Sequence, residues 1–471
     1  MSTETSFCGQ KQSVLGSAHS STDFSLDSMK EHSQELGIES ILHFPENIQY
    51  LKYEGKILAV AVNTANWLVL RTESEKCFLE SLRQRKAVGE VLSSLHDTAD
   101  KQLFLSLLSA IMARKFAGLY EVPNTEFVQG YKKLNIYLTN ACNLTCAHCF
   151  MKAGKKLKDE LNVNEWVRVL GEFAQAGGQS VTFTGGEPLM NSNFKSIIEV
   201  AYEKGIQSTV LTNGVLWTDE LIDHMSPMIA EIQISIDGVD DESNAKVRKA
   251  GIFEHLVNRV IRFANNGVRV SVATTFTNEN IESADKYVEL VNRINEATHN
   301  KVFFKLTKKI LPGRETQYTE EENWKYEARI REIENLIDSN AKYQSFIEGH
   351  TPNLVAKNCG FGGLSIAADG NVYFCNRVLE VTSQGNVKDQ PLSYFLEKGE
   401  MAHFTTGVDH VEPCQKCPLK YICGGGCRID DYDFKGKTWK DGQILKQQRC
   451  QGHNEHLLKM MVESYEYQYS F

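Results

Sequence analysis

The sequence predicts an α/β protein whose centre is a partial barrel of strand–helix units. Three observations predict this fold. Short apolar runs alternate with helical segments over residues 134–314, a small α+β unit precedes them, and closely spaced cysteines follow them. Alternation of this kind is typical of a parallel sheet with right-handed crossover connections. The 471 residues are enough for roughly three domains.

The N-terminal quarter predicts a tail and a small module. Residues 1–35 are rich in Ser, Thr and Glu and poor in large apolar residues, so we expect a disordered tail. Within residues 36–125 we expect three strands, with Glu54-Gly55-Lys56 as the first turn, at Ile48–Tyr53, Ile57–Val62 and Trp67–Leu70. Helical periodicity over residues 77–112 then predicts three helices. This order indicates a winged-helix-like module.

The middle of the chain, residues 126–345, carries the strand–helix alternation. The expected strands are Leu134–Leu138, Ser180–Thr184, Ser208–Thr212, Glu231–Ile236, Arg269–Thr274 and Val302–Leu306. Helices such as Val163–Ala176 and Phe194–Lys204 lie between them, which predicts a partial (β/α)6 TIM-like barrel. A charged helical connector is expected at residues 319–340. Residues 346–471 are rich in Gly and Cys, and we expect metal rather than a large core to hold them together.

Composition excludes several classes of protein. The chain has 51 basic and 60 acidic residues without long runs, unlike the concentrated basic surface of a nucleic-acid binder. No stretch approaches the roughly 18 apolar residues of a membrane span, and Met1–Glu35 lacks the core of a signal peptide. We therefore expect a cytoplasmic protein. Thiols stay reduced there, so ten cysteines clustered between Cys142 and Cys450 indicate metal ligation rather than disulfides.

A cysteine triad follows the first barrel strand. Cys142, Cys146 and Cys149 lie in the loop where barrel folds place their chemistry. Three thiolates can hold three irons of a [4Fe–4S] cube and leave the fourth iron open. Zinc is the alternative, because His148 could complete a four-coordinate site. The spacing alone favours iron–sulfur and leaves zinc open.

Further motifs stand at the ends of the following strands. Gly185, Gly186 and Glu187 end the second strand, Asn213 ends the third, and Ser235 and Asp237 end the fourth. Glycines let backbone carbonyls come close to a bound amino group, and Glu187 adds a negative acceptor.

With His148 at the ring position of C-x3-C-x-φ-C, the chain resembles the radical S-adenosylmethionine (radical SAM) superfamily. The resemblance implies that the amine and carboxylate of SAM chelate the open iron. It also implies that Gly185, Gly186 and Glu187 form the motif at the SAM amino group, and that Ser235 and Asp237 contact the ribose. Arg314, after the sixth strand, resembles a segment that often contacts the cofactor; a plain turn with a surface arginine is the alternative.

The C-terminal cysteines resemble, cysteine for cysteine, the seven-Cys SPASM domain of peptide-modifying radical SAM enzymes. The resemblance implies a proximal auxiliary cluster on Cys359, Cys375 and Cys427, and a distal one on Cys414, Cys417, Cys423 and Cys450. The turn Asp369-Gly370-Asn371 is expected to bring Cys359 and Cys375 together. No cysteine lies between 360 and 374, so a substrate thiolate, another side chain or water would complete the proximal cluster.

Two cysteines remain outside these groups. Cys8 lies in the tail, and Cys77 falls on an apolar helix face, where we expect a core residue. A radical peptide epimerase needs a spare thiol near the barrel mouth. Neither cysteine is expected there, which disfavours that activity.

The resemblance implies three [4Fe–4S] clusters, SAM, and an electron donor such as flavodoxin or ferredoxin. One electron cleaves SAM, and the 5′-deoxyadenosyl radical removes a hydrogen from the substrate. The N-terminal module resembles a precursor-peptide recognition element, which binds a leader peptide at a sheet edge and concentrates the core peptide at the barrel.

We therefore expect a maturase that installs an intramolecular cross-link in a ribosomally made peptide, with a thioether favoured over a carbon–carbon bond. One alternative is oxidation of a protein Cys or Ser, as in sulfatase maturation. Another is a non-catalytic iron–sulfur sensor or electron carrier, which would have no use for the Gly185-Gly186-Glu187 motif or the Ser235/Asp237 pair.

Overall fold

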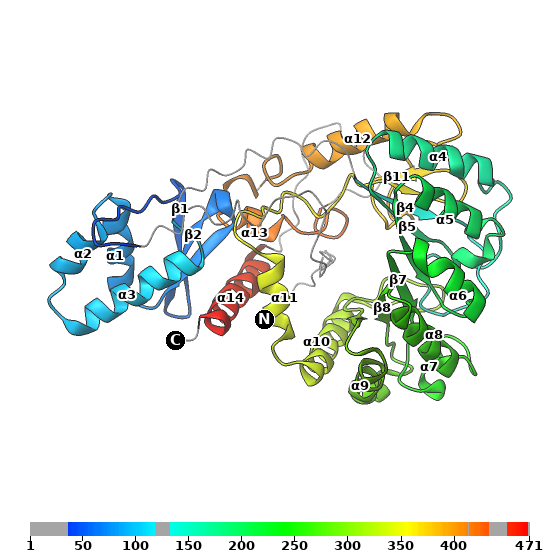
Figure 1. Ribbon diagram of the computed structural model, residues 1–471, viewed down its shortest axis with the longest axis horizontal. Helices are drawn as coiled ribbons and strands as arrows, with labels where there is room; N and C mark the ends of the chain where they lie inside the picture. Colours follow the sequence, from blue (N-terminus) through cyan, green and yellow to red (C-terminus); the bar gives the residue numbers. More distant parts are fainter. Residues whose placement is uncertain (1–35, 118–131, 413, 433–449, 470–471) are drawn as a thin grey trace.

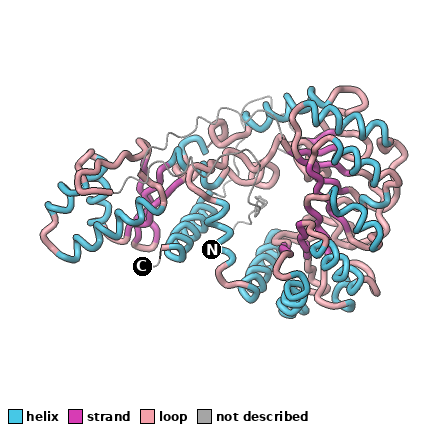
Figure 2. The backbone as a smooth tube through the Cα atoms, viewed as in Figure 1, coloured by secondary structure: helices cyan, strands magenta, loops and turns pink. Residues whose placement is uncertain are grey.

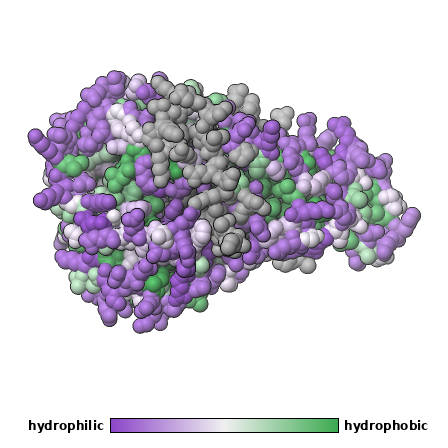
Figure 3. Space-filling view, turned by 180° about the vertical axis from the view of Figure 1, so that it is seen from behind, coloured by the Kyte–Doolittle hydropathy of each residue, from purple (hydrophilic) through white to green (hydrophobic). Residues whose placement is uncertain are grey.

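The computed structural model describes residues 36–117, 132–412, 414–432 and 450–469 (Figure 1). The expected tail, with Cys8, lies outside these residues. The N-terminal module lies at one end of an elongated molecule and the barrel at the other, each with its own sheet (Figures 1 and 2). Hydrophilic residues cover most of the described surface seen from behind (Figure 3). Within the described ranges, no helix is long and apolar enough to cross a membrane.

The N-terminal module has the expected three strands and three helices. The antiparallel sheet has the order β1-β2-β3. Its strands are β1 (Ile48–Tyr53), β2 (Lys56–Ala61) and β3 (Asn66–Leu70), and the helices are α1 (Glu73–Arg83), α2 (Val88–Ser94) and α3 (Thr98–Ala113). The turn between β1 and β2 is confirmed, because Glu54 and Gly55 both adopt positive φ there. Helix α1 begins with a capping box between Thr72 and Glu75.

The prediction that Cys77 is a core residue is wrong, because the structure exposes its thiol. Helix α1 buries Phe78, Leu79 and Leu82 instead. Cys77 therefore points away from the module's core, and Phe78 takes the place that the sequence pattern gave to Cys77, whereas the burial expected of Leu79 and Leu82 is confirmed.

The barrel carries six parallel strands in sequential order (Figure 1). They are β4 (Lys133–Tyr137), β5 (Ser180–Thr184), β6 (Gln207–Thr212), β7 (Glu231–Ser235), β8 (Arg269–Thr274) and β9 (Val302–Leu306). The helices between and after them are α4 (Val163–Gln175), α5 (Phe194–Glu203), α6 (Asp219–Met225), α7 (Asp241–Val247), α8 (Phe253–Asn265), α9 (Tyr287–Thr298) and α10 (Glu320–Ile337). Because all six strands run the same way, the loops that follow them meet at one end of the barrel.

The C-terminal part combines two short strands with helices of 4 to 19 residues. They are α11 (Ala341–Gly349), β10 (Ser365–Ile366), β11 (Val372–Tyr373), α12 (Leu392–Thr405), α13 (Lys420–Cys423) and α14 (Cys450–Gln468). Strand β10 pairs in parallel with β4 and antiparallel with β11, which extends the barrel sheet to eight strands.

The expectation that metal rather than a large core holds this part together needs correction. Phe361, Leu364 and Ile366 are buried in the hydrophobic core of the barrel. Leu419 and Ile422 are buried in a second core, which belongs to the N-terminal module. The C-terminal part therefore contributes to two cores, through contacts that no local pattern in the sequence reveals.

Helix α14 joins the end of the chain to the N-terminal module. Its residues Leu457 and Met461 are buried in the core of that module. The Trp67 indole of β3 donates a hydrogen bond to the Met461 carbonyl at 3.1 Å. Residues 58–61 of β2 are all buried, and successive strand residues face opposite sides, so both faces of the sheet are covered.

Candidate active site and cluster sites

The loop that carries Cys142, Cys146 and Cys149 is fixed by backbone contacts with the loop after β5. The Gly186 amide donates to the Thr139 carbonyl at 2.7 Å, and the Glu187 amide donates to the Ala141 carbonyl at 2.8 Å. A Cβ atom at Gly185 would lie 2.4 Å from the Thr139 oxygen, and one at Gly186 would lie 2.3 Å from the Ala141 oxygen. The two loops can approach this closely only because both residues are glycines.

Glu187 is fully buried and holds the next loop in place. Its carboxylate accepts hydrogen bonds from the Thr212 hydroxyl at 2.7 Å, the Asn213 amide at 2.8 Å and the Leu189 amide at 3.3 Å. Burial raises the pKa of Glu187, and these donors oppose that rise. The carboxylate is therefore committed to the protein, and it joins the loops after β5 and β6.

Asn213 lies beside the cysteine triad. Its side-chain amide donates to Asn143 Oδ1 at 2.8 Å, and its Nδ2 lies 3.8 Å from the Cys142 sulfur. The Asn213 Oδ1 accepts from the Val215 amide at 3.0 Å. The side chain is thereby held against the first cysteine of the triad.

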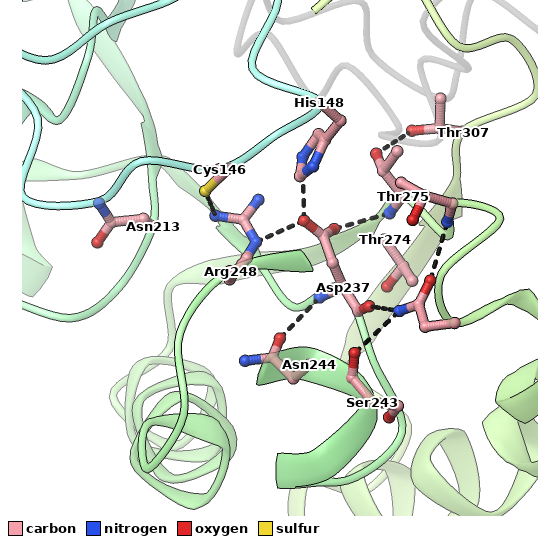
Figure 4. Close-up of polar contacts among 12 residues, drawn as sticks. Cys146, His148, Asn213, Asp237, Ser243, Asn244, Arg248, Thr274, Thr275 and Thr307 are labelled. Carbon is pink, nitrogen blue, oxygen red and sulfur yellow. Dashed lines mark hydrogen bonds and ion pairs between the residues drawn. The ribbon is translucent and has the colours of Figure 1, made fainter. Parts of the chain in front are cut away.

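Asp237 is the centre of a buried charged network (Figure 4). Its Oδ1 accepts the Thr275 amide at 2.7 Å, while Oδ2 accepts Arg248 Nε and lies 3.2 Å from His148 Nε2. Arg248 Nη1 reaches to 4.0 Å from the Cys146 sulfur. Burial alone would raise the pKa of Asp237, but Arg248 and then His148 lower it to about 2. The network therefore links the cysteine loop to β7 and β8.

Ser235 and Arg314 are the last two of the residues expected to contact SAM at this end of the barrel. Within the part of the chain that the structure describes, the half-buried Ser235 hydroxyl has no hydrogen-bond partner. Arg314 donates to the Ala153 carbonyl of the cysteine loop, and a Cβ at Gly313 would lie 2.6 Å from the His148 carbonyl carbon. Arg314 is therefore packed against the cysteine loop rather than being a free surface arginine.

Two polar atoms beside the triad fit a further bound group. His148 Nδ1 and Arg314 Nε are buried and have no hydrogen-bond partner within the described residues. Buried polar atoms in native proteins are normally satisfied. A polar ligand next to the cysteine loop would supply the missing partners.

The proximal group gathers around the β10–β11 hairpin. Cys359, Cys375 and Cys427 interact electrostatically with one another. The expected turn is confirmed, because Gly370 adopts φ +91° between the two strands. Arg377 donates its backbone amide to the Cys375 sulfur at 3.5 Å and its Nη1 to the Cys427 sulfur at 3.7 Å.

The distal group gathers between α13 and α14. Cys417 interacts electrostatically with Cys414, Cys423 and Cys450. Residues 424–426 are three glycines that all have positive φ, and the buried Arg428 guanidinium donates to the carbonyls of Gly424 and Gly426. This tight turn brings Cys427 out of the distal group and into the proximal one.

The distances between side chains in the three cysteine groups indicate which kind of metal site they fit. Among the described residues, no three Cys, His, Asp or Glu side chains are close enough to ligate one metal ion. Zinc needs all its ligands around one atom, whereas a cubane takes one thiolate at each iron. His148 also turns its Nε2 to Asp237 rather than to the cysteines. Because the triad needs only three thiolates for a cubane and His148 faces Asp237, the triad fits an iron–sulfur cluster better than a four-coordinate zinc site.

Sequence reasoning missed four residues of these sites, namely Arg248, Arg377, Arg428 and His453. The three arginines carry no motif, because only the fold brings them to the cysteines. His453 had a usable signal, since it follows Cys450 by three residues on one helix.

Comparisons with known proteins agree with this arrangement. Residues 136–291 match the Radical SAM superfamily, and residues 358–418 match SPASM, described as an iron-sulfur cluster-binding domain. The chain is 28% identical over 275 residues to "Sporulation killing factor maturation protein SkfB" of Bacillus subtilis, covering 56% of this chain and 62% of that protein. The match therefore spans less than two thirds of SkfB.

Two further proteins are similar. "AdoMet-dependent heme synthase" of Nitratidesulfovibrio vulgaris is 28% identical over 325 residues, which cover 64% of this chain and 88% of that protein. The structure "Native anSMEcpe with bound AdoMet and Cp18Cys peptide" has a TM-score of 0.50 at 19% identity, covering 71% of this chain and 99% of that chain. The structural likeness shows a shared fold.

The contact between the two loops predicts that Gly186→Ala disrupts the cysteine loop. The new methyl group would collide with the Ala141 oxygen, so we expect a loss of about 1–3 kcal/mol in the free energy of unfolding and reduced iron retention. Gly154→Ala is the matched control, because a Cβ there meets nothing within 4 Å. Urea unfolding and iron analysis of both variants make the test, and equal behaviour would contradict it.

The buried network predicts that Asp237→Asn destabilises the protein at neutral pH. The change leaves Arg248 buried without its counter-charge, which costs roughly 3–5 kcal/mol in comparable pairs. The pKa of Asp237 is lowered from 3.8 to about 2, so its contribution is complete above pH 4 and is lost as the pH falls toward 2.

Denaturant unfolding at several pH values measures this loss. The control is Asp223→Asn at the exposed pair with Arg262, where we expect little change. Equal stability of Asp237→Asn and the wild type at pH 7 would contradict the role given to the network.

Proposed function

We propose that this chain, which carries a radical SAM domain at residues 136–291 and an iron–sulfur cluster-binding SPASM domain at residues 358–418, matures a ribosomally made precursor peptide. The product is an intramolecular cross-link, with a thioether favoured and a carbon–carbon bond as the close variant. The observation that carries the proposal is the N-terminal sheet. Its edge strand β3 is buried throughout, but the other edge strand, β1, is partly exposed and offers backbone groups to which an extended peptide can pair.

The triad Cys142, Cys146 and Cys149 would hold the catalytic [4Fe–4S] cluster and leave one iron for SAM. Bound there, the reduced cluster supplies the electron that releases a 5′-deoxyadenosyl radical, which takes a hydrogen atom from the peptide. The residues at this site would act in two ways. Ser235 has a free hydroxyl to offer to SAM, whereas Glu187 and Asp237 position the loops around it.

The other residues expected to bind SAM have roles in the same proposal. His148, Gly185, Gly186, Asn213 and Arg314 would line the SAM site, because each lies at or against the cysteine loop. Gly185 and Gly186 would serve it chiefly by allowing the two loops to approach. Arg314 Nε and His148 Nδ1 are buried without a hydrogen-bond partner among the described residues, and a ligand could supply one.

Two auxiliary clusters would bring the total to three [4Fe–4S] clusters. Cys359, Cys375 and Cys427 would hold the proximal one, and Cys414, Cys417, Cys423 and Cys450 the distal one. In the thioether reaction a peptide carbon gives a hydrogen atom to the 5′-deoxyadenosyl radical, a cysteine thiol gives up its proton, and the C–S bond forms. The proximal cluster would serve as acceptor for the surplus electron, and a flavodoxin or ferredoxin would supply the electron that starts each cycle.

We assign one role to each of the three domains, in the order in which they occur in the sequence. Residues 36–125 would bind the leader, 126–345 would generate the radical, and 346–471 would carry the auxiliary clusters. Holding the leader raises the effective concentration of the core peptide at the barrel. The match to SkfB, whose name describes a maturation protein, supports a role in maturation.

A tetrapyrrole is the second candidate substrate. The match to the heme synthase has the same 28% identity and covers more of that relative, 88% against 62%. The N-terminal sheet argues for the peptide, because pairing at a strand edge recognises an extended backbone.

The cysteine assignment predicts the behaviour of the triple variant Cys142→Ala/Cys146→Ala/Cys149→Ala. We expect it to lose cleavage of SAM to 5′-deoxyadenosine, with iron falling from about twelve to about eight atoms per chain. Cys77→Ala is the control, because that thiol is exposed on α1. This variant should keep both the cleavage of SAM and the iron content of the wild type. Chromatography of 5′-deoxyadenosine and iron analysis measure the effects; full turnover in the triple variant would refute the assignment.

The substrate assignment predicts a defined change in peptide mass. Co-expression with a short Cys-containing precursor encoded beside this chain should yield a product lighter by about two hydrogens per link. A precursor without its leader should be processed poorly. An unchanged peptide beside a modified tetrapyrrole would favour the second candidate.

A further inference from the structure

We propose that His453 is a positioning residue of the distal site, which donates a hydrogen bond from Nε2 to the Cys423 sulfur and raises the reduction potential of the cluster bound there. The inference rests on the proposed function, because that function assigns Cys414, Cys417, Cys423 and Cys450 to the distal cluster.

The contact between His453 and the distal group is short. His453 Nε2 lies 3.2 Å from the Cys423 sulfur. Cys450 begins α14 and His453 follows it by three residues, a spacing that puts both side chains on the same side of a helix. His453 therefore stands where the four cysteines gather.

The chemistry of iron ligation decides the direction of this hydrogen bond. A thiolate that ligates iron has no proton to donate, so the contact with Cys423 requires the hydrogen to be on Nε2. Hydrogen bonds to ligating sulfurs are one of the levers that set cluster potentials. An N–H donor stabilises the more negative, reduced state and thus raises the potential.

The imidazole is held by a rigid support. One turn beyond His453, Leu457 is buried, and Met461 is buried in the core that also contains Trp67. Cys423 ends α13, whose Ile422 is buried in the same core. Both partners of the hydrogen bond are therefore anchored to one packed unit, which keeps their distance fixed.

The other cysteine groups also have side-chain donors, but at longer range. Arg248 Nη1 lies 4.0 Å from the Cys146 sulfur, and Arg377 Nη1 lies 3.7 Å from the Cys427 sulfur. Both arginines also bind carboxylates, Asp237 and Asp430. Within the distal group, the Tyr432 hydroxyl lies 3.5 Å from the Cys414 sulfur but donates its hydrogen to the Gly425 carbonyl at 2.8 Å. The contact of His453 with Cys423 is shorter, at 3.2 Å, so removal of His453 should affect the distal potential most directly.

The test is an EPR-monitored redox titration of the full-length, anaerobically reconstituted protein. The variants are His453→Leu, which removes the donor, and His453→Gln, whose amide can still donate. The matched control is His224→Leu on the half-exposed surface of α6. We expect His453→Leu to move one midpoint potential to a more negative value, His453→Gln to restore part of it, and His224→Leu to change none.

Three results would overturn the inference. The first is a His453→Leu midpoint that matches the wild type within replicate scatter. The second is loss of one cluster's iron in both His453 variants, which would make His453 a ligand. The third is a nitrogen coupling of direct ligation in pulsed EPR of the wild type. Failure of the wild type to cleave SAM would count against the proposed function alone, because the midpoints can still be compared.

Discussion

The close approach of two backbone loops is the constraint on which the rest of the site depends. The loop after β4 carries the cysteine triad, and it lies directly on the loop after β5 through the Gly186 and Glu187 amides. No side chain fits between them, since a Cβ at either glycine would meet a carbonyl oxygen. Glu187 then extends the contact to the loop after β6. The geometry of the triad is thus set by glycines and by one buried carboxylate.

The second support is electrostatic, and it comes from the loops after the next two strands of the sheet, β7 and β8. Asp237 lies within reach of Arg248, His148 and the Thr275 amide, so β7 and β8 are joined to the cysteine loop. A buried carboxylate is costly without such partners. The network stabilises the ionised carboxylate and also fixes the ring of His148, which turns away from the cysteines. An open iron would therefore face the cofactor rather than a histidine.

Local patterns in the sequence predicted most elements of the fold and the cysteine triad, because strand alternation and cysteine spacing are local signals. The division of the other seven cysteines into two groups came from the resemblance to the SPASM domain. Local patterns could not predict the pairing of β10 with β4, or α14 in the N-terminal core, since both depend on contacts between distant segments. The prediction for Cys77 failed for a local reason, because its neighbour Phe78 occupies the buried face of α1 together with Leu79 and Leu82. The roles of Arg248, Glu187 and Asp237 depend on side-chain partners that only the folded chain brings together.

The shared core between α14 and the N-terminal sheet places the module expected to bind peptide next to the distal cysteines, while the SPASM hairpin joins the barrel. The proposed function requires that one iron of a cluster held by the triad is open to SAM. EPR of the dithionite-reduced wild-type protein, recorded with and without SAM, tests this most directly. SAM should change the g values of one cluster and leave the others unaltered. Identical spectra would contradict the account.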